Sequence, residues 1–284
     1  YIGRMIPYRK TWNVAGTVLD FSTPRIMGIL NITEDSFYDG GLYQDEAGFK
    51  NKVLQMVEEG ADILDLGAMS SRPGAIELPV ETEIERLLQA LRWMRELGID
   101  CFISVDTYRA DVLRAALDHG AHICNDISGG LLDSGLWGVL AEYKVPYILM
   151  HMAGQPQNMQ NAPHYQDVTN DILQFFITRI NALHGLGIYD ILVDPGFGFG
   201  KTIEHNYTIL QDLNAFHLTN KPILVGISRK SMIYRPLKTT PDVVLPGTSA
   251  LHFAALERGA DVLRVHDVAA ARQVITVFEQ LKTG

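Results

Sequence analysis

Apolar and amphipathic segments alternate along most of this chain. From residue 25 onward there are eight short apolar runs, each long enough for one buried strand, and the stretches between them carry apolar residues at the spacing that favours helices. The segment 12–23 alternates loosely around Gly16, which predicts a short hairpin ahead of the regular part. The eight runs are 26–30, 62–66, 102–105, 122–124, 147–150, 191–193, 223–225 and 262–265.

Glycines punctuate the predicted helices. At the start of one helix, the sequence TEIE at 82–85 resembles a capping box, which predicts that the helix begins there. Similar phrases at 58–66, 117–126 and 256–265 each run from a helix end through a glycine into a strand. This repetition lacks the fixed period of a solenoid. The glycines expected at helix ends are Gly60, Gly98, Gly120 and Gly187.

Eight strand and helix pairs predict a (β/α)₈ barrel. Such barrels usually need about 250 residues, and this chain has 284. Since no linker divides the chain, we expect one domain over 1–284, with an N-terminal hairpin segment at 1–24 and the barrel at 25–284. A doubly wound open sheet is the alternative fold, because its strand number is less constrained.

Composition narrows the class of partner. The chain is 47% hydrophobic and has a formal net charge of −9, which predicts a globular protein without general affinity for nucleic acid. No apolar run reaches the roughly 18 residues of a membrane span, and residues 1–10 are too polar for a secretory signal. We therefore expect no membrane partner and a cytoplasmic location. Cys101 and Cys124 lie in apolar runs, where reduced, buried thiols are typical.

The stretch 193–202, VDPGFGFGKT, looks at first like a nucleotide-binding loop, because its glycines run into GKT after a predicted strand. The pattern G-x-x-x-x-G-K-[ST] fails by one residue, since Pro195 stands at the first glycine and has no amide hydrogen to donate to a phosphate. What remains is a carboxylate, Asp194, at the end of a strand, with Lys201 and Thr202 predicted to begin the next helix. Nucleotide binding is kept as an alternative.

Polar side chains gather at the carboxyl ends of the predicted strands, where the active site of such a barrel lies. Arg264 and His266 are two residues apart and therefore share one face of their strand. This many polar residues at successive strand ends are typical of a functional site rather than of strand stability. They are Asn31, Asp65, Asp106, Asn125, Asp126, His151, Asp194, Ser228, Arg229, Lys230, Ser231, Arg264 and His266.

These residue types predict a ligand with two unlike parts. Asp106, Asn125 and Asp194 offer acceptors and an amide to a flat heterocycle with N–H donors. A second set suits an anion such as phosphate, and it comprises Arg72, Lys230, Arg264 and His266. For Arg229 we expect instead an ion pair with a nearby carboxylate. The loops 31–41 and 67–74 are longer than usual βα loops and resemble lids over the site.

Eight motifs, each placed after the proper strand, together resemble the dihydropteroate synthase family. Members of that family are transferases that condense a dihydropterin pyrophosphate with p-aminobenzoate in folate biosynthesis. The resemblance spans most of the chain, and the joint order of the motifs is specific although each alone is weak. The motifs are MGILNITEDSFYDGG at 27–41, SSRPG at 70–74, SVDTYR at 104–109, NDISGG at 125–130, MHM at 150–152, DPGFGFGKT at 194–202, GISRKS at 226–231 and RVHD at 264–267.

The resemblance implies a role for each matching residue. The pterin would be bound by Asp106, Asn125, Met150, Asp194, Phe199, Gly226, Lys230 and Arg264. The pyrophosphate would be held by Asn31, Arg264 and His266, with Mg²⁺ ligated by Asn31 and Asp39. The p-aminobenzoate would face Ser70, Ser71, Arg72, Pro73, Phe199 and Ser231. Catalysis would rest on Asp39, Asp106, Lys230, Arg264 and His266.

The family's reaction implies a dissociative, S_N1-like path, because the departing pyrophosphate leaves a methylene cation on an electron-rich ring. Asp106 and Asp39 would favour that cation, while Mg²⁺ and the basic side chains would take up charge on the pyrophosphate. The partners implied are the two small-molecule substrates and a second copy of the chain, in a homodimer formed through the apolar segments 248–258 and 269–281.

Some positions depart from the family's commoner residues, namely Glu34, Tyr38 and the pair Ala68 and Met69, all in the lids. Two related activities are alternatives. A pterin-binding methyltetrahydrofolate methyltransferase has no pyrophosphate to bind, which the segment 228–231 and the basic pair on the last strand argue against. A catalytically silent pterin-binding homologue would lose lid and anion-binding residues that this chain retains.

Overall fold

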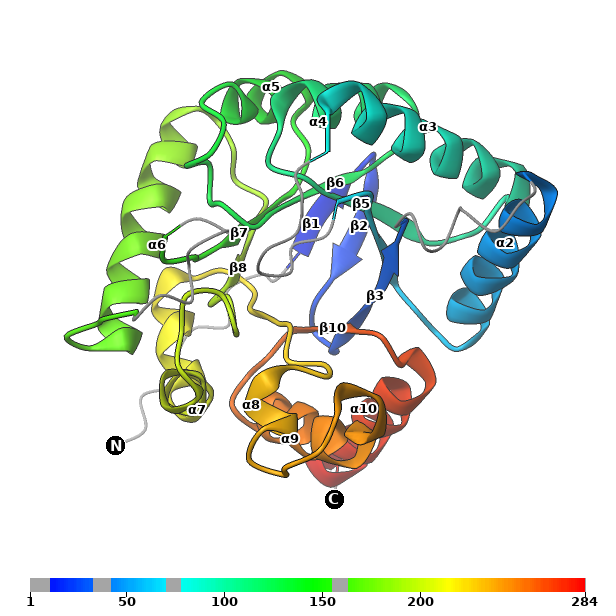
Figure 1. The fold of residues 1–284 in the computed structure, drawn as a ribbon. Helices are drawn as coiled ribbons and strands as arrows, with labels where there is room; N and C mark the ends of the chain where they lie inside the picture. Colours follow the sequence, from blue (N-terminus) through cyan, green and yellow to red (C-terminus); the bar gives the residue numbers. More distant parts are fainter. Residues whose placement is uncertain (1–10, 33–41, 70–77, 155–162, 284) are drawn as a thin grey trace.

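The computed structural model describes residues 11–32, 42–69, 78–154 and 163–283. Eight parallel strands form a nearly closed barrel, with helices arranged around its outside (Figure 1). The strands are β3 (Arg25–Asn31), β4 (Ile63–Gly67), β5 (Phe102–Asp106), β6 (Ile123–Asp126), β7 (Tyr147–Met150), β8 (Ile191–Asp194), β9 (Leu224–Val225) and β10 (Val262–Val265). Each lies within one or two residues of a run predicted from the sequence.

The sheet order identifies the fold. Strands adjacent in the sequence are adjacent in the sheet, in the order β8-β7-β6-β5-β4-β3-β10-β9, and β10 pairs with β3. A parallel bridge between Val193 and Ile223 brings the two edge strands together. The barrel prediction is therefore confirmed, and the doubly wound alternative is wrong, because its first strand would lie inside an open sheet rather than pair with the last one.

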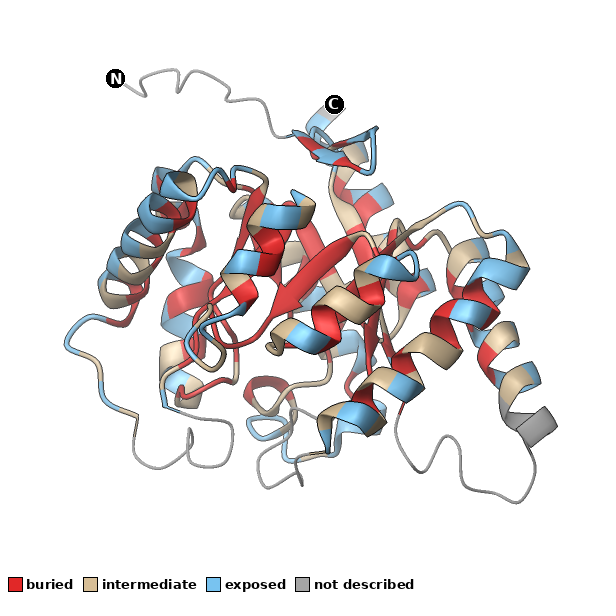
Figure 2. Ribbon diagram, turned by 90° about the horizontal axis from the view of Figure 1, so that it is seen from above, coloured by how far each residue is buried: buried red, intermediate tan, exposed pale blue. Residues whose placement is uncertain are grey.

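Helices cover the outer face of the strands. Figure 2 shows buried residues concentrated in the strands and on the helix faces that turn toward them, as amphipathic surface helices require. The helices are α2 (Leu42–Glu58), α3 (Val80–Leu97), α4 (Ala110–Asp118), α5 (Leu136–Tyr143), α6 (Val168–Gly185), α7 (Ile203–Gln211), α8 (Ser231–Tyr234), α9 (Leu245–Glu257) and α10 (Val268–Thr283), with short 3₁₀ turns at Leu213–Thr219 and Pro241–Val243.

The helix ends agree with most of the sequence signals. Gly98 caps α3 in the left-handed conformation, at φ 59°, and the other three predicted glycines, Gly60, Gly120 and Gly187, also have positive φ. The capping box predicted at 82–85 is wrong, because α3 begins at Val80 with Pro79 as its N-cap. Glu83 lies inside the helix, where its buried carboxylate accepts hydrogen bonds from Thr107 and Arg109.

The predicted hairpin closes the amino-terminal end of the barrel. Strands β1 (Thr11–Val14) and β2 (Thr17–Asp20) pair in antiparallel fashion. Their apolar side chains share a buried cluster with the first inward-facing residues of the barrel strands. The cluster contains Trp12, Val14, Leu19 and Phe21 from the hairpin segment, and Met27, Ile63, Ile123, Ile148, Leu192, Leu224 and Val262 from the barrel.

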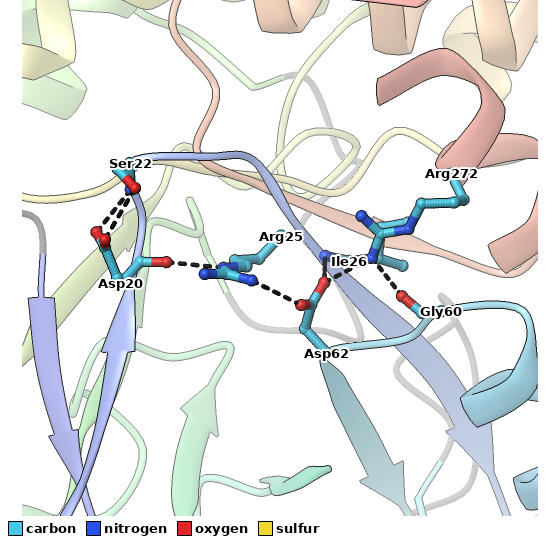
Figure 3. Close-up of polar contacts among 7 residues, drawn as sticks. All are labelled: Asp20, Ser22, Arg25, Ile26, Gly60, Asp62 and Arg272. Atoms are coloured by element: carbon cyan, nitrogen blue, oxygen red, sulfur yellow. Dashed lines mark hydrogen bonds and ion pairs between the residues drawn. The ribbon is translucent and has the colours of Figure 1, made fainter. Parts of the chain in front are cut away.

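A charged network joins this end of the barrel to the last helix. Asp62, just before β4, accepts hydrogen bonds from the backbone N–H of Ile26 at 2.8 Å and from Arg272 of α10 at 2.9 Å (Figure 3). Its other oxygen accepts from Arg25 at 3.1 Å, and Arg25 also donates to the Asp20 carbonyl at 2.7 Å. One carboxylate therefore links the hairpin, the first barrel strand and the C-terminal helix.

Cys101 and Cys124 are free thiols, as predicted, although Cys101 is only partly buried while Cys124 is buried. Burial raises the pKa of Cys101 to about 12, so this thiol stays protonated at neutral pH. Within the ranges that the structure covers, no helix combines the length and the apolar character needed to cross a membrane.

We predict that Asp62→Ala lowers the free energy of unfolding by about 2 kcal/mol. The change leaves Arg25, Arg272 and the Ile26 N–H without this hydrogen-bond acceptor. Urea unfolding checks this. The matched control is Glu142→Ala, which removes the partner of Arg114 in an ion pair exposed to solvent on both sides and should change stability little. If the two substitutions changed stability equally, Asp62 would not stabilise the link between the hairpin, β3 and α10.

Candidate active site

The barrel interior changes from apolar to polar along several of the strands. Side chains two residues apart point to the same face, so the residue two positions beyond each apolar plug residue also faces inward. These next positions carry polar groups on β4, β6, β8 and β10, which bring Asp65, Asn125, Asp194 and Arg264 together above the plug. Asp106 on β5 and His266 after β10 lie one step further toward the carboxyl ends of the strands. The carboxyl end of the barrel is therefore a polar mouth.

Arg264 lies at the centre of this mouth between two carboxylates. Its Nε donates to Asp65 Oδ2 at 2.7 Å, and its Nη2 donates to Asp106 Oδ2 at 2.8 Å. Burial alone would lower the pKa of the guanidinium, but Asp65 and Asp106 outweigh burial and raise it. Asp65 also accepts from Asn125 Nδ2 at 2.9 Å. Strands β4, β5, β6 and β10 are thus joined by one polar network.

The Asp106 carboxyl is poised near neutrality. Its pKa is raised to about 7, chiefly by burial and also by the negative charges of Asp65, Asp126 and Glu83, against the opposing effect of Arg264. A group that titrates near neutral pH in a polar mouth is typical of a functional site. Asp126, by contrast, is fully committed to structure, because its oxygens accept from Ser128, Gly130 and Tyr147.

Asp194 and Lys230 form a second charged pair in the mouth. Asp194 is buried, and its Oδ1 accepts from the Gly196 N–H at 2.7 Å. Burial raises the pKa of Asp194, while Lys230 acts to lower it. Burial lowers the pKa of Lys230 to about 8, and Asp194 partly opposes the shift. The Lys230 ammonium donates to the Phe197 carbonyl and lies 4.7 Å from the centre of the Phe199 ring, within cation–π range.

An apolar wall adjoins these charges. Met150 and Phe199, both predicted site residues, share a buried cluster with Ile127 and Met152. Gly226 lies against Arg264, since a Cβ added to this glycine would stand 3.8 Å from the Arg264 Cβ. The mouth therefore offers an apolar surface edged by hydrogen-bond acceptors, which suits a planar heterocycle.

The last two strands carry the remaining predicted residues. His266 Nδ1 lies 3.0 Å from Ser228 Oγ, and burial together with Arg264 lowers the pKa of the imidazole to about 4. His266 is therefore neutral at pH 7 and serves as a hydrogen-bonding group rather than a charge. Arg229 forms the predicted ion pair, with Asp267, and Ser231 begins α8 beside Lys230.

The loop 195–202 between β8 and α7 explains the glycine-rich motif. Lys201 is buried, and its ammonium donates to the Phe199 carbonyl at 2.9 Å and lies 3.1 Å from His151 Nδ1. A Cβ on Gly196 would stand 1.9 Å from the His151 carbonyl oxygen, so only glycine fits. The Lys201 amine therefore holds this loop against the end of β7 and does not project toward a phosphate. The nucleotide-loop alternative is wrong, while Thr202 caps α7 as predicted.

Part of the predicted site lies outside the described residues, namely Asp39 of the proposed metal site and Ser70, Ser71, Arg72 and Pro73 of the second lid, together with the departures Glu34 and Tyr38. Asn31 ends β3 at the mouth, and its side chain is exposed. Across the described ranges, the side chains form no cluster of three or more His, Cys, Asp or Glu residues that could hold a metal alone.

Sequence reasoning missed the roles of two buried residues. Asp65 was noted on its strand but given no ligand or partner, although a carboxylate inside an apolar strand is itself a signal that a cation lies nearby. Lys201 was assigned only to the start of a helix. Its burial could not be read from the motif, because its partners His151 and Phe199 come from two different loops.

Residues 27–266 match the family model described as pterin binding enzyme. The chain is 42% identical over 266 residues to the dihydropteroate synthase of Escherichia coli (strain K12), with 93% of this chain and 94% of that protein covered. A solved structure of the Xanthomonas albilineans dihydropteroate synthase with 4-aminobenzoic acid is similar at a TM-score of 0.89 and 38% identity, over 97% of this chain and 99% of that chain. A structure of that enzyme with 7,8-dihydropteroate gives a TM-score of 0.85 and 36% identity, over 96% and 99% of the two chains.

Lys201 should make stability depend on pH. Burial lowers its pKa to about 7 from an ordinary value of 10.5, so between these values the unfolded chain binds more protons and stability rises with pH. We predict that wild type gains roughly 1 kcal/mol per pH unit relative to Lys201→Met across that window. Urea unfolding of both proteins at several pH values measures this. A difference that does not vary with pH would contradict a buried, titrating amine.

Proposed function

The chain belongs to the dihydropteroate synthase family of pterin-binding enzymes, transferases of folate synthesis, and on this premise we propose how its barrel mouth works. The reaction joins 6-hydroxymethyl-7,8-dihydropterin pyrophosphate to p-aminobenzoate and yields 7,8-dihydropteroate and pyrophosphate. The observation that carries the proposal is the division of the mouth into acceptors beside an apolar wall and basic groups around Arg264.

The pterin is proposed to lie on the wall formed by Met150 and Phe199, with Gly226 leaving room beside it. Asp194 accepts from the exocyclic amino group and the neighbouring ring N–H. Among the described contacts, the Gly196 N–H donates to its Oδ1, which leaves Oδ2 for the ligand. Asn125 and Asp106 bind the opposite edge of the ring. Lys230 and the guanidinium face of Arg264 complete the pocket.

The pyrophosphate is proposed to lie at the outer edge of the mouth, between Asn31, Arg264 and His266. The neutral imidazole of His266 donates one hydrogen bond to it, because Ser228 accepts from the His266 backbone N–H and can donate its own proton to Nδ1. That arrangement places the ring proton on Nε2. A neutral donor binds the leaving group without a second buried charge that the protein would have to desolvate.

The p-aminobenzoate is proposed to enter beside Ser231 and Phe199, where α8 begins next to Lys230. Ser70, Ser71, Arg72 and Pro73 would contact it from the second lid, with Arg72 paired to its carboxylate. The assignment of these four residues is supported by the family motif SSRPG at 70–74.

The bond between the methylene carbon and the pyrophosphate oxygen is proposed to break first, with the electron pair leaving on oxygen. The methylene cation that remains is delocalised over the pterin, and the ionised carboxylates of Asp106 and Asp39 favour it electrostatically. The neutral arylamine nitrogen then attacks the methylene carbon and releases its proton. No strong base is required, because the arylamine nitrogen is already neutral at pH 7.

The donors at the outer edge fit Mg²⁺ as a cofactor. Asn31 presents an amide oxygen at the exposed end of β3, and Asp39 would add a carboxylate from the first lid. Mg²⁺ needs few protein ligands, because it keeps several waters and binds substrate phosphates. When bound there, it would neutralise charge on the pyrophosphate.

We also infer one domain over 1–284, a homodimer and a cytoplasmic location. The packing of the hairpin into the barrel plug supports a single domain. Free thiols and an acidic composition support the cytoplasm. Exposed apolar side chains around α8, α9 and α10 support a contact with a second copy, and they are Leu237, Val243, Leu245, Val277 and Leu281.

The direct test supplies the dihydropterin pyrophosphate, p-aminobenzoate and Mg²⁺, and follows pyrophosphate together with 7,8-dihydropteroate. We expect equal amounts of the two products, and release of pyrophosphate that depends on the arylamine. Folded protein that forms no dihydropteroate would overturn the proposal. Pyrophosphate released without coupled product would point to hydrolysis instead.

Protonation of Asp106 should give an acidic limb in the pH profile of kcat/KM for the pterin substrate. Its pKa is about 7 in the presence of the charges that face it, which are Arg264, Asp65, Asp126, Glu83 and Lys230. Below that value the carboxyl is neutral and cannot favour the cation, so kcat/KM for the pterin substrate should fall roughly tenfold per pH unit at the lowest pH values. Asp106→Asn should react slowly and lose this limb. Because titration of the substrate is common to both proteins, an unchanged limb in the variant would assign it to the substrate.

A further inference from the structure

Asp65 is a fully buried carboxylate at the base of the mouth. It lies in the middle of β4 with no exposed surface, in the same layer as Asn125 and Arg264. Its Oδ2 accepts from Asn125 Nδ2 at 2.9 Å and from Arg264 Nε at 2.7 Å, and it lies 2.6 Å from Arg264 Nη2. One oxygen of Asp65 therefore contacts two side chains that come from strands on either side of it.

The first consequence concerns the amide of Asn125. An amide has a donor end and an acceptor end, and either can face a ligand. Since the NH₂ group of Asn125 donates to Asp65, the carbonyl oxygen is the end that points away from Asp65. The side chain is 4% exposed, so it has little freedom to rotate. The pocket thus presents an acceptor at this position.

The second consequence concerns the plane of Arg264. Its Nε and Nη2 atoms are held by Asp65, and Nη2 also donates to Asp106. Three contacts to two carboxylates from β4 and β5 leave the guanidinium little rotational freedom. A fixed planar cation is what stacking on a heterocycle requires.

Stability does not account for Asp65. Its second oxygen, Oδ1, is buried and has no hydrogen-bond partner within the described part of the chain. A buried carboxylate with an unused oxygen costs stability, and apolar residues often replace buried ion pairs without loss. The residue is better explained by what it holds in place than by the energy it contributes.

We propose that Asp65 is a positioning residue for the pterin pocket, which fixes Asn125 as a hydrogen-bond acceptor and Arg264 as a stacking plane. The inference rests on the proposed function, because it assumes that these two side chains meet the pterin. Asp65 itself does not touch the substrate. It acts through two neighbours that the sequence places 60 and 199 residues away.

The test is Asp65→Asn, which keeps the shape but removes the charge and allows either end of the Asn125 amide to face the ligand. We expect the affinity for 6-hydroxymethyl-7,8-dihydropterin pyrophosphate, measured by titration calorimetry, to fall about tenfold or more, because a donor then faces a donor in part of the molecules. In steady-state kinetics, KM for p-aminobenzoate should change less than about threefold, since that substrate contacts neither neighbour.

The matched control is Ser104→Ala. Ser104 pairs with Asp65 in register on β5, is equally buried, and its hydroxyl has no partner within the described part of the chain. Its loss should leave pterin affinity within about twofold of wild type, because no hydrogen bond is removed. If Ser104→Ala weakens binding as much as Asp65→Asn, any change in this layer perturbs the pocket and the specific role of Asp65 is overturned.

A pH profile separates positioning from general damage. Asp106 is faced by Arg264, Asp65, Asp126, Glu83 and Lys230, and the negative charge of Asp65 raises the pKa of Asp106. Asp65→Asn should therefore move the acidic limb of kcat/KM to lower pH, by roughly half a unit or more. Damage to folding alone would lower the rate and leave the midpoint in place, which would count against the inference.

The two hypotheses fail in different ways. Wild type that does not bind the pterin pyrophosphate would overturn the proposed function. Wild type that binds it while Asp65→Asn binds equally, with an unchanged pH midpoint, would overturn the role of Asp65 alone. If Asp65→Asn cannot be purified folded, Asp65→Ser takes its place with the same readouts, since the smaller polar side chain removes the charge and leaves room for a water.

Discussion

The site depends on one buried cation, the guanidinium of Arg264, held between Asp65 and Asp106 inside the barrel. A charge at this depth is tolerable only when it is paired and hydrogen-bonded. The pairing joins the last strand to the second and third strands of the barrel, across 199 and 158 residues of sequence. The apolar plug beneath, sealed by the hairpin, keeps water from the other end and makes each of these interactions stronger.

Charge in the mouth is distributed rather than concentrated. The two histidines His151 and His266 are both neutral at pH 7, because burial lowers their pKa values to about 3 and about 4. Lys201 and Lys230 contact the loop 195–202 through the carbonyls of Phe199 and Phe197, and so shape that loop as well as contributing charge. A reaction that separates a cation from an anion needs opposite fields a short distance apart, and carboxylates and cations lie side by side in this mouth.

Much of the architecture could be predicted from the sequence, because strands buried on both faces are short apolar runs and glycines end helices by local rules. The common mouth of Asp106, Asn125, Asp194 and Arg264 could also be predicted, because the carboxyl ends of all barrel strands meet at one end of the barrel. The contacts of Asp65 with Asn125 and Arg264, and of Lys201 with His151, could not be predicted, since these partners are remote in sequence. The capping signal at 82–85 failed because α3 begins earlier, at Val80, and Glu83 inside the helix is buried against Thr107 and Arg109.

The central claim is that the geometry of Arg264, and not only its charge, organises the pocket. Affinity of Arg264→Lys for the dihydropterin pyrophosphate, measured by titration calorimetry together with a thermal melt, tests it most directly. An ammonium keeps the charge but cannot bridge Asp65 and Asp106 or present a plane, so we predict a folded protein whose affinity falls about tenfold or more. A folded variant that binds as tightly as wild type would contradict the account.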